Sequence, residues 1–145
     1  MGNTVGRLSQ REKLAYIAGF LDGDGSIMLQ LRKNLNGNII RIKTVICLYQ
    51  DFKYKEELKW MQKLLGGYVY TRNDHMSELR IEGFAKVLEV LELLKPFLRF
   101  KRRQASLLIK LIPRLQQKTV DKHSVAEWIK KMREYNYYSS QRTAL

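Results

Sequence analysis

The chain has little cysteine or histidine, and it has no long apolar run. Cys47 is the only cysteine, which excludes a disulfide within the chain and a zinc site built on cysteines. The two histidines, His75 and His123, have no companions that would complete a catalytic triad. No apolar run approaches the roughly 18 residues that span a membrane, and the N-terminus lacks the apolar core of a signal peptide. We therefore expect a soluble, intracellular protein with no membrane partner.

Acidic residues are also few relative to basic ones. The 145 residues include 27 Lys and Arg against 14 Asp and Glu, a net charge of +13, which favours a polyanionic partner. A ribosomal protein or an RNA chaperone would show the same bias, so charge alone does not identify the function. With 45% apolar residues and no low-complexity linker, residues 1–145 are expected to form a single domain.

Residues 10–23, approximately, predict a helix that presents small side chains to a partner. Ser9 and Glu12 have the spacing of a capping box, so the helix is expected to begin near Gln10. A glycine at position 19 costs about 1 kcal/mol relative to alanine, so a packing reason is expected for Gly19. Apolar residues at helical spacing are expected to face a core: Leu14, Ile17 and Leu21.

The helix leads into Asp22-Gly23-Asp24-Gly25, where the two glycines suit a tight turn. An aspartate at position 24 meets the negative end of the helix dipole, which disfavours it unless a cation is present. Carboxylate and carbonyl oxygens are the ligands that Mg²⁺ prefers, so this end is a candidate metal site. A plain turn between helix and strand is the alternative. The spacing of the later residues excludes a calcium-binding loop.

Alternating apolar and polar residues predict two β-hairpins, with tips at residues 34–38 and 73–77. On the second strand, Ile40 is expected to face inward and Cys47 outward. Helical spacing predicts further helices after each hairpin and near the C-terminus, with Pro113 kinking or ending one of them. The fold class is therefore α+β, with helices packed on one face of a four-stranded antiparallel sheet.

The nine residues 17–25 resemble the signature of the LAGLIDADG homing endonucleases. The later segments follow that family's order of elements, α-β-β-α-β-β-α, so the resemblance covers most of the chain, with extra helices at about 118–145 as a C-terminal extension. It implies a saddle-shaped sheet and an intron-encoded, site-specific endonuclease that binds double-stranded DNA. The identical positions are Ala18, Gly19, Asp22, Asp24 and Gly25.

The motif occurs once, which in this family implies a homodimer. Cutting a duplex needs a reaction on each strand, and a symmetric dimer supplies two sites for a pseudo-palindromic target. The scissile phosphates face each other across a minor groove about 6 Å wide, so the two motif helices must touch closely. The residues expected at that interface are Ala15, Ala18, Gly19 and Asp22.

The resemblance also implies the chemistry. Asp24 is expected to hold a divalent metal with the Gly23 carbonyl, while Asp22 is expected to brace the helix pair. Mg²⁺ is the expected cofactor, with Mn²⁺ as an alternative and Ca²⁺ binding without cleavage. Gln50 matches a residue that positions water, and Lys101 matches a lysine that stabilises phosphate charge. Simple solvation of Gln50, or a phosphate-gripping role for the basic run around Lys101, is the alternative for each.

The polar face of the sheet mixes residue types that read DNA bases, although a solvated face of a one-sided sheet would look similar. One departure from close relatives is Tyr54, flanked by Lys53 and Lys55, where they carry an arginine. Two other functions use the same fold, an intron RNA maturase and a DNA-binding regulator that does not cut. The residues expected to contact DNA are Gln30, Arg32, Asn34, Arg41, Lys43, Tyr70, Arg72, Glu78 and Arg80.

Overall fold

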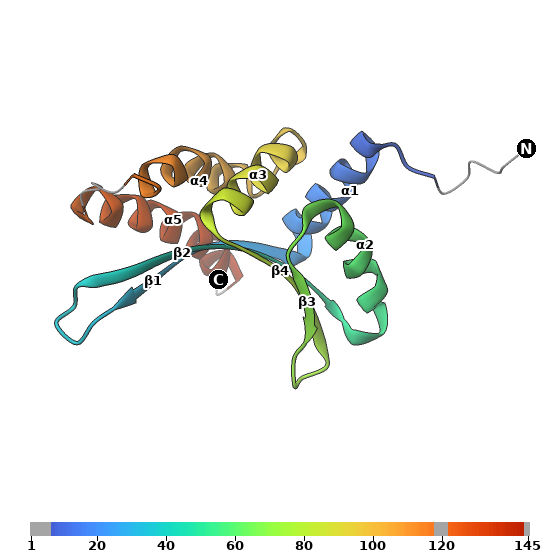
Figure 1. The fold of residues 1–145 in the computed structure, drawn as a ribbon, viewed down its shortest axis with the longest axis horizontal. Coiled ribbons are helices and arrows are strands. Elements are labelled where there is room, and N and C mark those ends of the chain that lie inside the picture. Colours follow the sequence, from blue (N-terminus) through green and yellow to red (C-terminus); the bar gives the residue numbers. More distant parts are fainter. Residues whose placement is uncertain (1–6, 118–121, 144–145) are drawn as a thin grey trace, which may run out of the picture.

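A computed structural model describes residues 7–117 and 122–143 of the chain. Four antiparallel strands form one sheet in the order β1-β2-β4-β3, and the helices lie on one of its faces (Figure 1). Two short 3₁₀ turns, at Phe52–Tyr54 and Lys95–Phe97, join neighbouring elements. The elements are α1 (Gln10–Asp24), β1 (Gly25–Lys33), β2 (Ile39–Asp51), α2 (Lys55–Leu65), β3 (Tyr68–Thr71), β4 (Met76–Glu82), α3 (Phe84–Leu94), α4 (Arg102–Leu115) and α5 (Lys122–Thr143).

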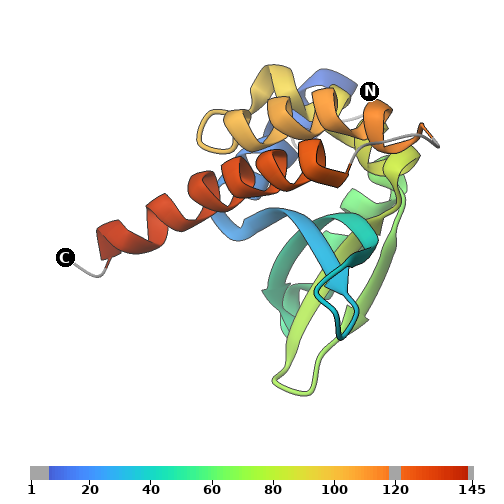
Figure 2. The ribbon, with the colours of Figure 1, turned by 90° about the vertical axis from the view of Figure 1, so that its left-hand side faces the viewer.

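This arrangement confirms the predicted α+β class and the predicted order of elements. The core lies between the helices and the sheet face that carries Ile27, Ile46 and Leu79, all of which are buried. Both hairpins project away from the helix layer, so the opposite face of the sheet forms a concave surface beneath it (Figures 1 and 2). None of the described helices is long and apolar enough to cross a membrane.

Helix α1 begins where its cap residues predict. The Ser9 side chain accepts a hydrogen bond from the backbone of Glu12, and the Glu12 carboxylate accepts one from the backbone of Ser9. The far end differs from the expected turn, because Asp24 is the last helical residue and Gly25 is extended. Gly25 is required by close packing, since a Cβ there would collide with Leu21 and lie 2.9 Å from the carbonyl of Cys47.

Two side chains of β2 differ from the alternation expected for that strand. Ile40 is 56% exposed, because the register with β1 shifts there: Arg41 pairs with Arg32 and Ile39 with Lys33, so Ile40 is the extra residue of a β-bulge. Cys47 does lie on the polar face, opposite Ser26 and Arg80 in the neighbouring strands, but it is fully buried there. The neighbouring side chains cover it, and this burial raises the pKa of its thiol.

The C-terminal half of the helix layer follows the prediction with one difference. Pro113 lies inside α4, which continues for two more residues before it ends at Leu115. Helix α5 packs on α4 and on β1, and it buries Val125, Ile129 and Met132, which recur at helical spacing. This helix therefore closes the core above the edge strand β1.

Candidate active site and nucleic-acid-binding face

The first aspartate of the motif, Asp22, holds a distant loop against the end of α1. Asp22 is only 9% exposed, and its carboxylate accepts hydrogen bonds from the backbone N–H groups of Arg99 (2.7 Å) and Lys101 (2.9 Å). Both oxygens are therefore engaged within the protomer, and these two hydrogen bonds form the Asp22 clamp. Asp22 was expected to brace a pair of motif helices, and the structure shows it bracing the segment that leads into α4.

This clamp brings Lys101 to the motif. The Lys101 ammonium donates a hydrogen bond of 2.8 Å to the carbonyl of Asp22, one of the carbonyls at the end of α1 that lack a partner within the helix. Burial lowers the pKa of Lys101, and the negative charges of Asp22 and Asp24 oppose that shift. Lys101 therefore lies within electrostatic reach of both motif carboxylates, although 77 residues separate Asp24 from it in sequence.

The second aspartate, Asp24, is exposed, in contrast to Asp22. It ends α1 beside exposed Gly23, so a carboxylate and free helix-end carbonyls meet at one point of the surface. These are hard oxygen donors, and they fit Mg²⁺, which is usually held by one or two carboxylates together with substrate phosphates. The described residues contain no cluster of three or more His, Cys, Asp or Glu side chains that could hold a metal. One protomer therefore offers an incomplete set of ligands, which a nucleic-acid phosphate and a second copy of the motif would extend.

Gln50 lies near the end of β2 that adjoins the start of β1, where Asp24 precedes the strand. Gly25, the residue after Asp24, pairs with Leu48 of β2, and Gln50 is two residues further along that strand on the same face. Its side-chain oxygen accepts a hydrogen bond of 2.9 Å from the backbone of Asp51. This leaves the amide group as the donor that Gln50 presents near the end of α1.

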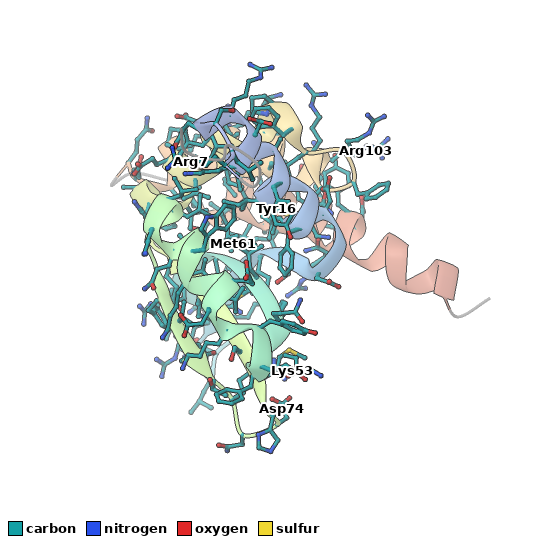
Figure 3. The ribbon with its side chains drawn as sticks, turned by 90° about the vertical axis from the view of Figure 1, so that its right-hand side faces the viewer. Arg7, Tyr16, Lys53, Met61, Asp74 and Arg103 are labelled. Carbon is teal, nitrogen blue, oxygen red and sulfur yellow. The ribbon has the colours of Figure 1, made fainter. Side chains whose placement is uncertain are left out.

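The basic residues around Tyr54 lie just after the end of β2. Lys53 and Tyr54 are exposed, and the Lys53 ammonium lies 5.7 Å from the centre of the Tyr54 ring. Figure 3 shows Lys53 at the same end of the molecule as Asp74 of the β3–β4 turn. A backbone hydrogen bond of 2.8 Å from Phe52 to His75 joins the two segments.

The exposed side of α1 carries the small residues that the motif places there. Ala15, Gly19 and Gly23, each four residues apart, are exposed, and a Cβ on Gly19 or Gly23 would meet no atom within 4 Å. Beside them lies Tyr16 (Figure 3), which is 58% exposed. Its ring packs edge-on against that of Trp60 of α2, with ring centres 5.9 Å apart.

Two of the four expected interface residues do not lie on this exposed side. Ala18 is fully buried in the protomer's own core, because it is four residues after Leu14 and three before Leu21, on the core side of the helix. Asp22, one turn further on, is held in the clamp described above. Ala15 and Gly19 remain free for contact with a partner.

The strand register places most of the expected DNA-contacting residues on the concave face of the sheet. Gln30 and Arg32 of β1 pair with Lys43 and Arg41 of β2, and these four side chains share that face. Gln30, Arg32 and Arg41 are exposed. Asn34 lies at the hairpin tip, where its side-chain oxygen accepts hydrogen bonds from two backbone N–H groups of the turn.

The other half of that face is a network organised by Glu78. This residue is only 5% exposed, so it is not presented to a partner as the sequence suggested. Its carboxylate accepts hydrogen bonds from Tyr70 (2.8 Å) and Arg72 (3.4 Å) and lies 3.9 Å from Arg80. The contact with Glu78 raises the pKa of the Tyr70 hydroxyl. Glu78 therefore positions three of the expected DNA-contacting residues.

Glu82 plays a similar part and was missed as a functional residue. It pairs with Arg80 and, at 3.2 Å, with Lys43, so it links β4 to β2. Tyr49 was also missed, although its hydroxyl lies 3.1 Å from that of Ser26 on the same face. Because side chains alternate along a strand, Tyr49 and Glu82 face the same side of the sheet as the predicted DNA-contacting residues of β2 and β4. This alternation is the signal in the sequence that could have identified them.

Residues 17–112 match the family model described as LAGLIDADG endonuclease. The DNA endonuclease I-CreI of Chlamydomonas reinhardtii is 30% identical over 141 residues, which cover 92% of this chain and 84% of I-CreI. The DNA endonuclease I-CvuI of Chlorella vulgaris is 35% identical over 105 residues, 71% of this chain and 65% of I-CvuI. The chain therefore spans just under two thirds of I-CvuI in that alignment.

Solved structures agree with the sequence comparison. I-CvuI in complex with its target in 2 mM Ca superposes with a TM-score of 0.77 at 31% identity, over 86% of this chain and 82% of the other. A second structure of I-CvuI, with the I-CreI target in 2 mM Mg and the DNA not cleaved, gives a TM-score of 0.75. The chain belongs to the LAGLIDADG endonuclease family.

Proposed function

We propose that this protein is a homing endonuclease that makes a double-strand break in a long, pseudo-palindromic DNA target. It acts as a homodimer and hydrolyses phosphodiester bonds with divalent metal, Mg²⁺ in the first place. The observation that carries the proposal is the end of α1, where exposed Asp24 and partly buried Lys101 are brought together by the Asp22 clamp. The relatives whose structures contain bound DNA support the nuclease over an RNA maturase or a regulator that does not cut.

Each residue of the site has a part that its position supports. Asp24 would hold the metal together with the Gly23 carbonyl, and a bound metal would supply Lewis-acid chemistry at the scissile phosphate and a more acidic water. Lys101 places its ammonium near the phosphate that reacts, where a positive charge stabilises the extra negative charge of the transition state. The side-chain oxygen of Gln50 is held by the backbone of Asp51, so its amide NH₂ group donates a hydrogen bond to water and orients that water at the end of β2.

The dimer follows from the incomplete set of ligands in one protomer. A minor groove about 6 Å wide requires two catalytic ends that lie almost side by side. Contact between two α1 helices through Ala15 and Gly19 would allow this, because neither residue carries a bulky side chain on the exposed side. The concave faces of the two protomers then follow a single duplex, with the cations of the sheet near its phosphates.

The test is Asp24→Asn, which keeps the shape of the side chain and removes its charge. We expect cleavage of a plasmid that carries the target to fall by about three orders of magnitude, because the metal supplies several kcal/mol of transition-state stabilisation. Binding of the same target, measured by gel shift in Ca²⁺, should change by much less. Glu57→Gln, on the exposed surface of α2, is the control and should cut normally. Normal cutting by Asp24→Asn would remove this residue from the metal site.

A further inference from the structure

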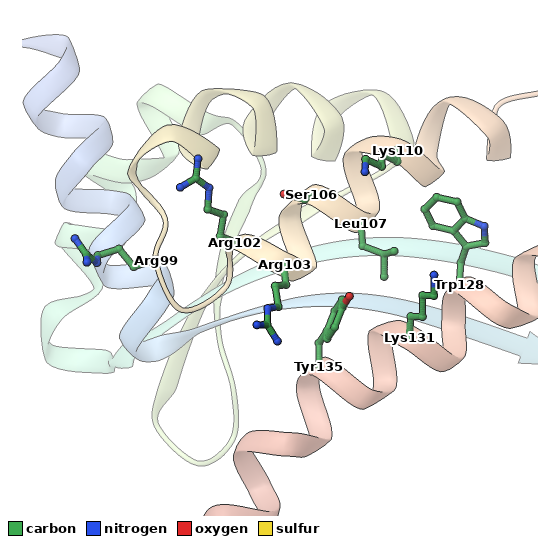
Figure 4. A pocket seen from close by; sticks show the side chains of 9 residues that line it. All are labelled: Arg99, Arg102, Arg103, Ser106, Leu107, Lys110, Trp128, Lys131 and Tyr135. Carbon is green, nitrogen blue, oxygen red and sulfur yellow. The ribbon is translucent and has the colours of Figure 1, made fainter.

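A basic groove runs between α4 and α5, and it begins beside the segment 99–102 that carries Lys101. It has a volume of about 540 Å³, and both helices contribute its walls (Figure 4). Ser106 and Leu107 of α4 and the half-buried aromatic residues Trp128 and Tyr135 of α5 also line it. Its cationic residues are Arg99, Arg102, Arg103, Lys110 and Lys131.

These cations are not neutralised by the protein. Among the described residues, none of the five takes part in an ion pair, and no acidic side chain lines the groove. On the sheet face, by contrast, Lys43, Arg72 and Arg80 each pair with a carboxylate, and only Arg32 and Arg41 near the hairpin tip resemble the groove cations in having no ion pair among the described residues. The groove therefore gathers positive charge that no described carboxylate pairs with and that an external anion would balance.

The lining indicates which kind of anion fits. Arg103 and Lys110 are two helical turns apart on α4, with Ser106 between them, so polar groups recur at about every 5.4 Å along one wall. The opposite wall carries the rings of Tyr135 and Trp128, and the Arg114 guanidinium of α4 already lies over the Trp128 ring, 5.2 Å from its centre. A cationic track that is lined by aromatic rings is typical of sites for single-stranded nucleic acid, where phosphates follow the charge and bases stack on the rings.

The groove lies on the helix side of the sheet, whereas the concave face points the other way (Figures 1 and 2). A duplex held on the concave face therefore leaves the groove free. We propose that the groove between α4 and α5 is a second nucleic-acid site, which binds the backbone of a single strand. This site is independent of the cleavage reaction proposed above.

The experiment removes three charges from the middle of the groove in the triple variant R103Q/K110Q/K131Q. Arg99 and Arg102 stay unchanged because they flank Lys101 of the candidate active site. The control K63Q/K130Q/R133Q removes three exposed charges that do not line the groove. Fluorescence anisotropy then measures binding of the full-length chain to a labelled RNA of roughly 16 nucleotides, the upper end of such footprints. The matching DNA strand and a duplex of the same sequence complete the set of probes.

We expect the groove variant to bind single strands about tenfold more weakly than the control variant does. The slope of log affinity against log salt should fall by about 2, since three lost contacts each contribute roughly 0.7. Tighter binding of RNA than of the DNA strand would assign the groove to RNA, and the reverse to DNA. Equal single-strand binding by the two variants would overturn the proposal. So would an equal loss on the duplex, because the groove would then belong to the duplex surface.

Discussion

At the scale of single residues, the two aspartates of the motif have separate duties. Asp22 is buried and joins α1 to the segment before α4 through two charge-assisted hydrogen bonds. Asp24 is exposed at the end of the helix. Two carboxylates that are two residues apart therefore differ in their surroundings, because successive positions of a helix point about 100° apart. Substitution of Asp22 should therefore reduce both stability and cleavage, whereas substitution of Asp24 should reduce cleavage alone.

We expect Asp22→Asn to lower the free energy of unfolding by about 1–3 kcal/mol, because an amide has one acceptor oxygen where the carboxylate uses two. Cleavage should fall as well, since the same hydrogen bonds hold Lys101 near the motif. Urea denaturation followed by circular dichroism measures the first effect. Asp24→Asn is the matched control and should leave stability nearly unchanged. A similar loss of stability in both variants would contradict this division of roles.

At the scale of elements, the sheet face holds Lys43, Arg72 and Arg80 in ion pairs before any partner binds, whereas Arg32 and Arg41 near the hairpin tip are exposed and take part in none of the ion pairs among the described residues. Glu78 and Glu82 of β4 contact Arg72, Arg80 and Lys43 from three different strands or turns. Ordering these long side chains in advance lowers the entropy lost on binding and fixes where their donors point. The network therefore favours discrimination between sequences over simple attraction to phosphate.

The contact between Glu78 and Tyr70 can be tested through the tyrosine. The hydrogen bond to Glu78 and its negative charge raise the pKa of Tyr70, so Glu78→Gln should lower that pKa toward its ordinary value. NMR titration of tyrosine labelled at Cζ measures the change. Glu82→Gln is the matched control, because it should lower the pKa of Tyr68 and leave that of Tyr70 almost unaltered. An unchanged pKa of Tyr70 in Glu78→Gln would show that the two side chains do not interact in solution.

At the scale of the whole molecule, the exposed side of α1 decides whether two protomers can cooperate. Gly19 sits inside a helix, where glycine costs about 1 kcal/mol relative to alanine, and nothing in its own protomer approaches it. The protomer therefore gains nothing from this glycine. Close approach of a second copy is the benefit that the proposed dimer would supply.

We expect Gly19→Leu to convert the proposed dimer to a monomer and to abolish double-strand cleavage. The protomer itself should be no less stable, because leucine is the better helix former by up to about 1 kcal/mol and has room at this position. Analytical ultracentrifugation gives the oligomeric state, and thermal unfolding of the monomer gives the stability. Ala85→Leu, on the exposed surface of α3, is the control for an added leucine and should stay dimeric. A dimer that persists in Gly19→Leu would place the interface elsewhere.

The fold could be predicted almost entirely from local patterns. Alternation located the four strands, helical spacing located the helices, and the Ser9–Glu12 pair located the start of α1. The errors occurred where the third dimension overrides alternation. Ile40 has the alternation expected for burial, but a β-bulge shifts the register at that point and leaves it exposed, and Cys47 lies on the polar face but is covered by its neighbours.

The sequence by itself determined the order of elements, the basic character of the protein and the motif that delivers Asp24 to the surface. These features depend on residues close together in the chain, whose periodicity is fixed by backbone geometry. Only the tertiary structure decided that Asp22 binds backbone groups 77 and 79 residues away, and that Glu78 is withdrawn from the surface. Such contacts join residues remote in sequence, so they exist only once the sheet and helices have packed.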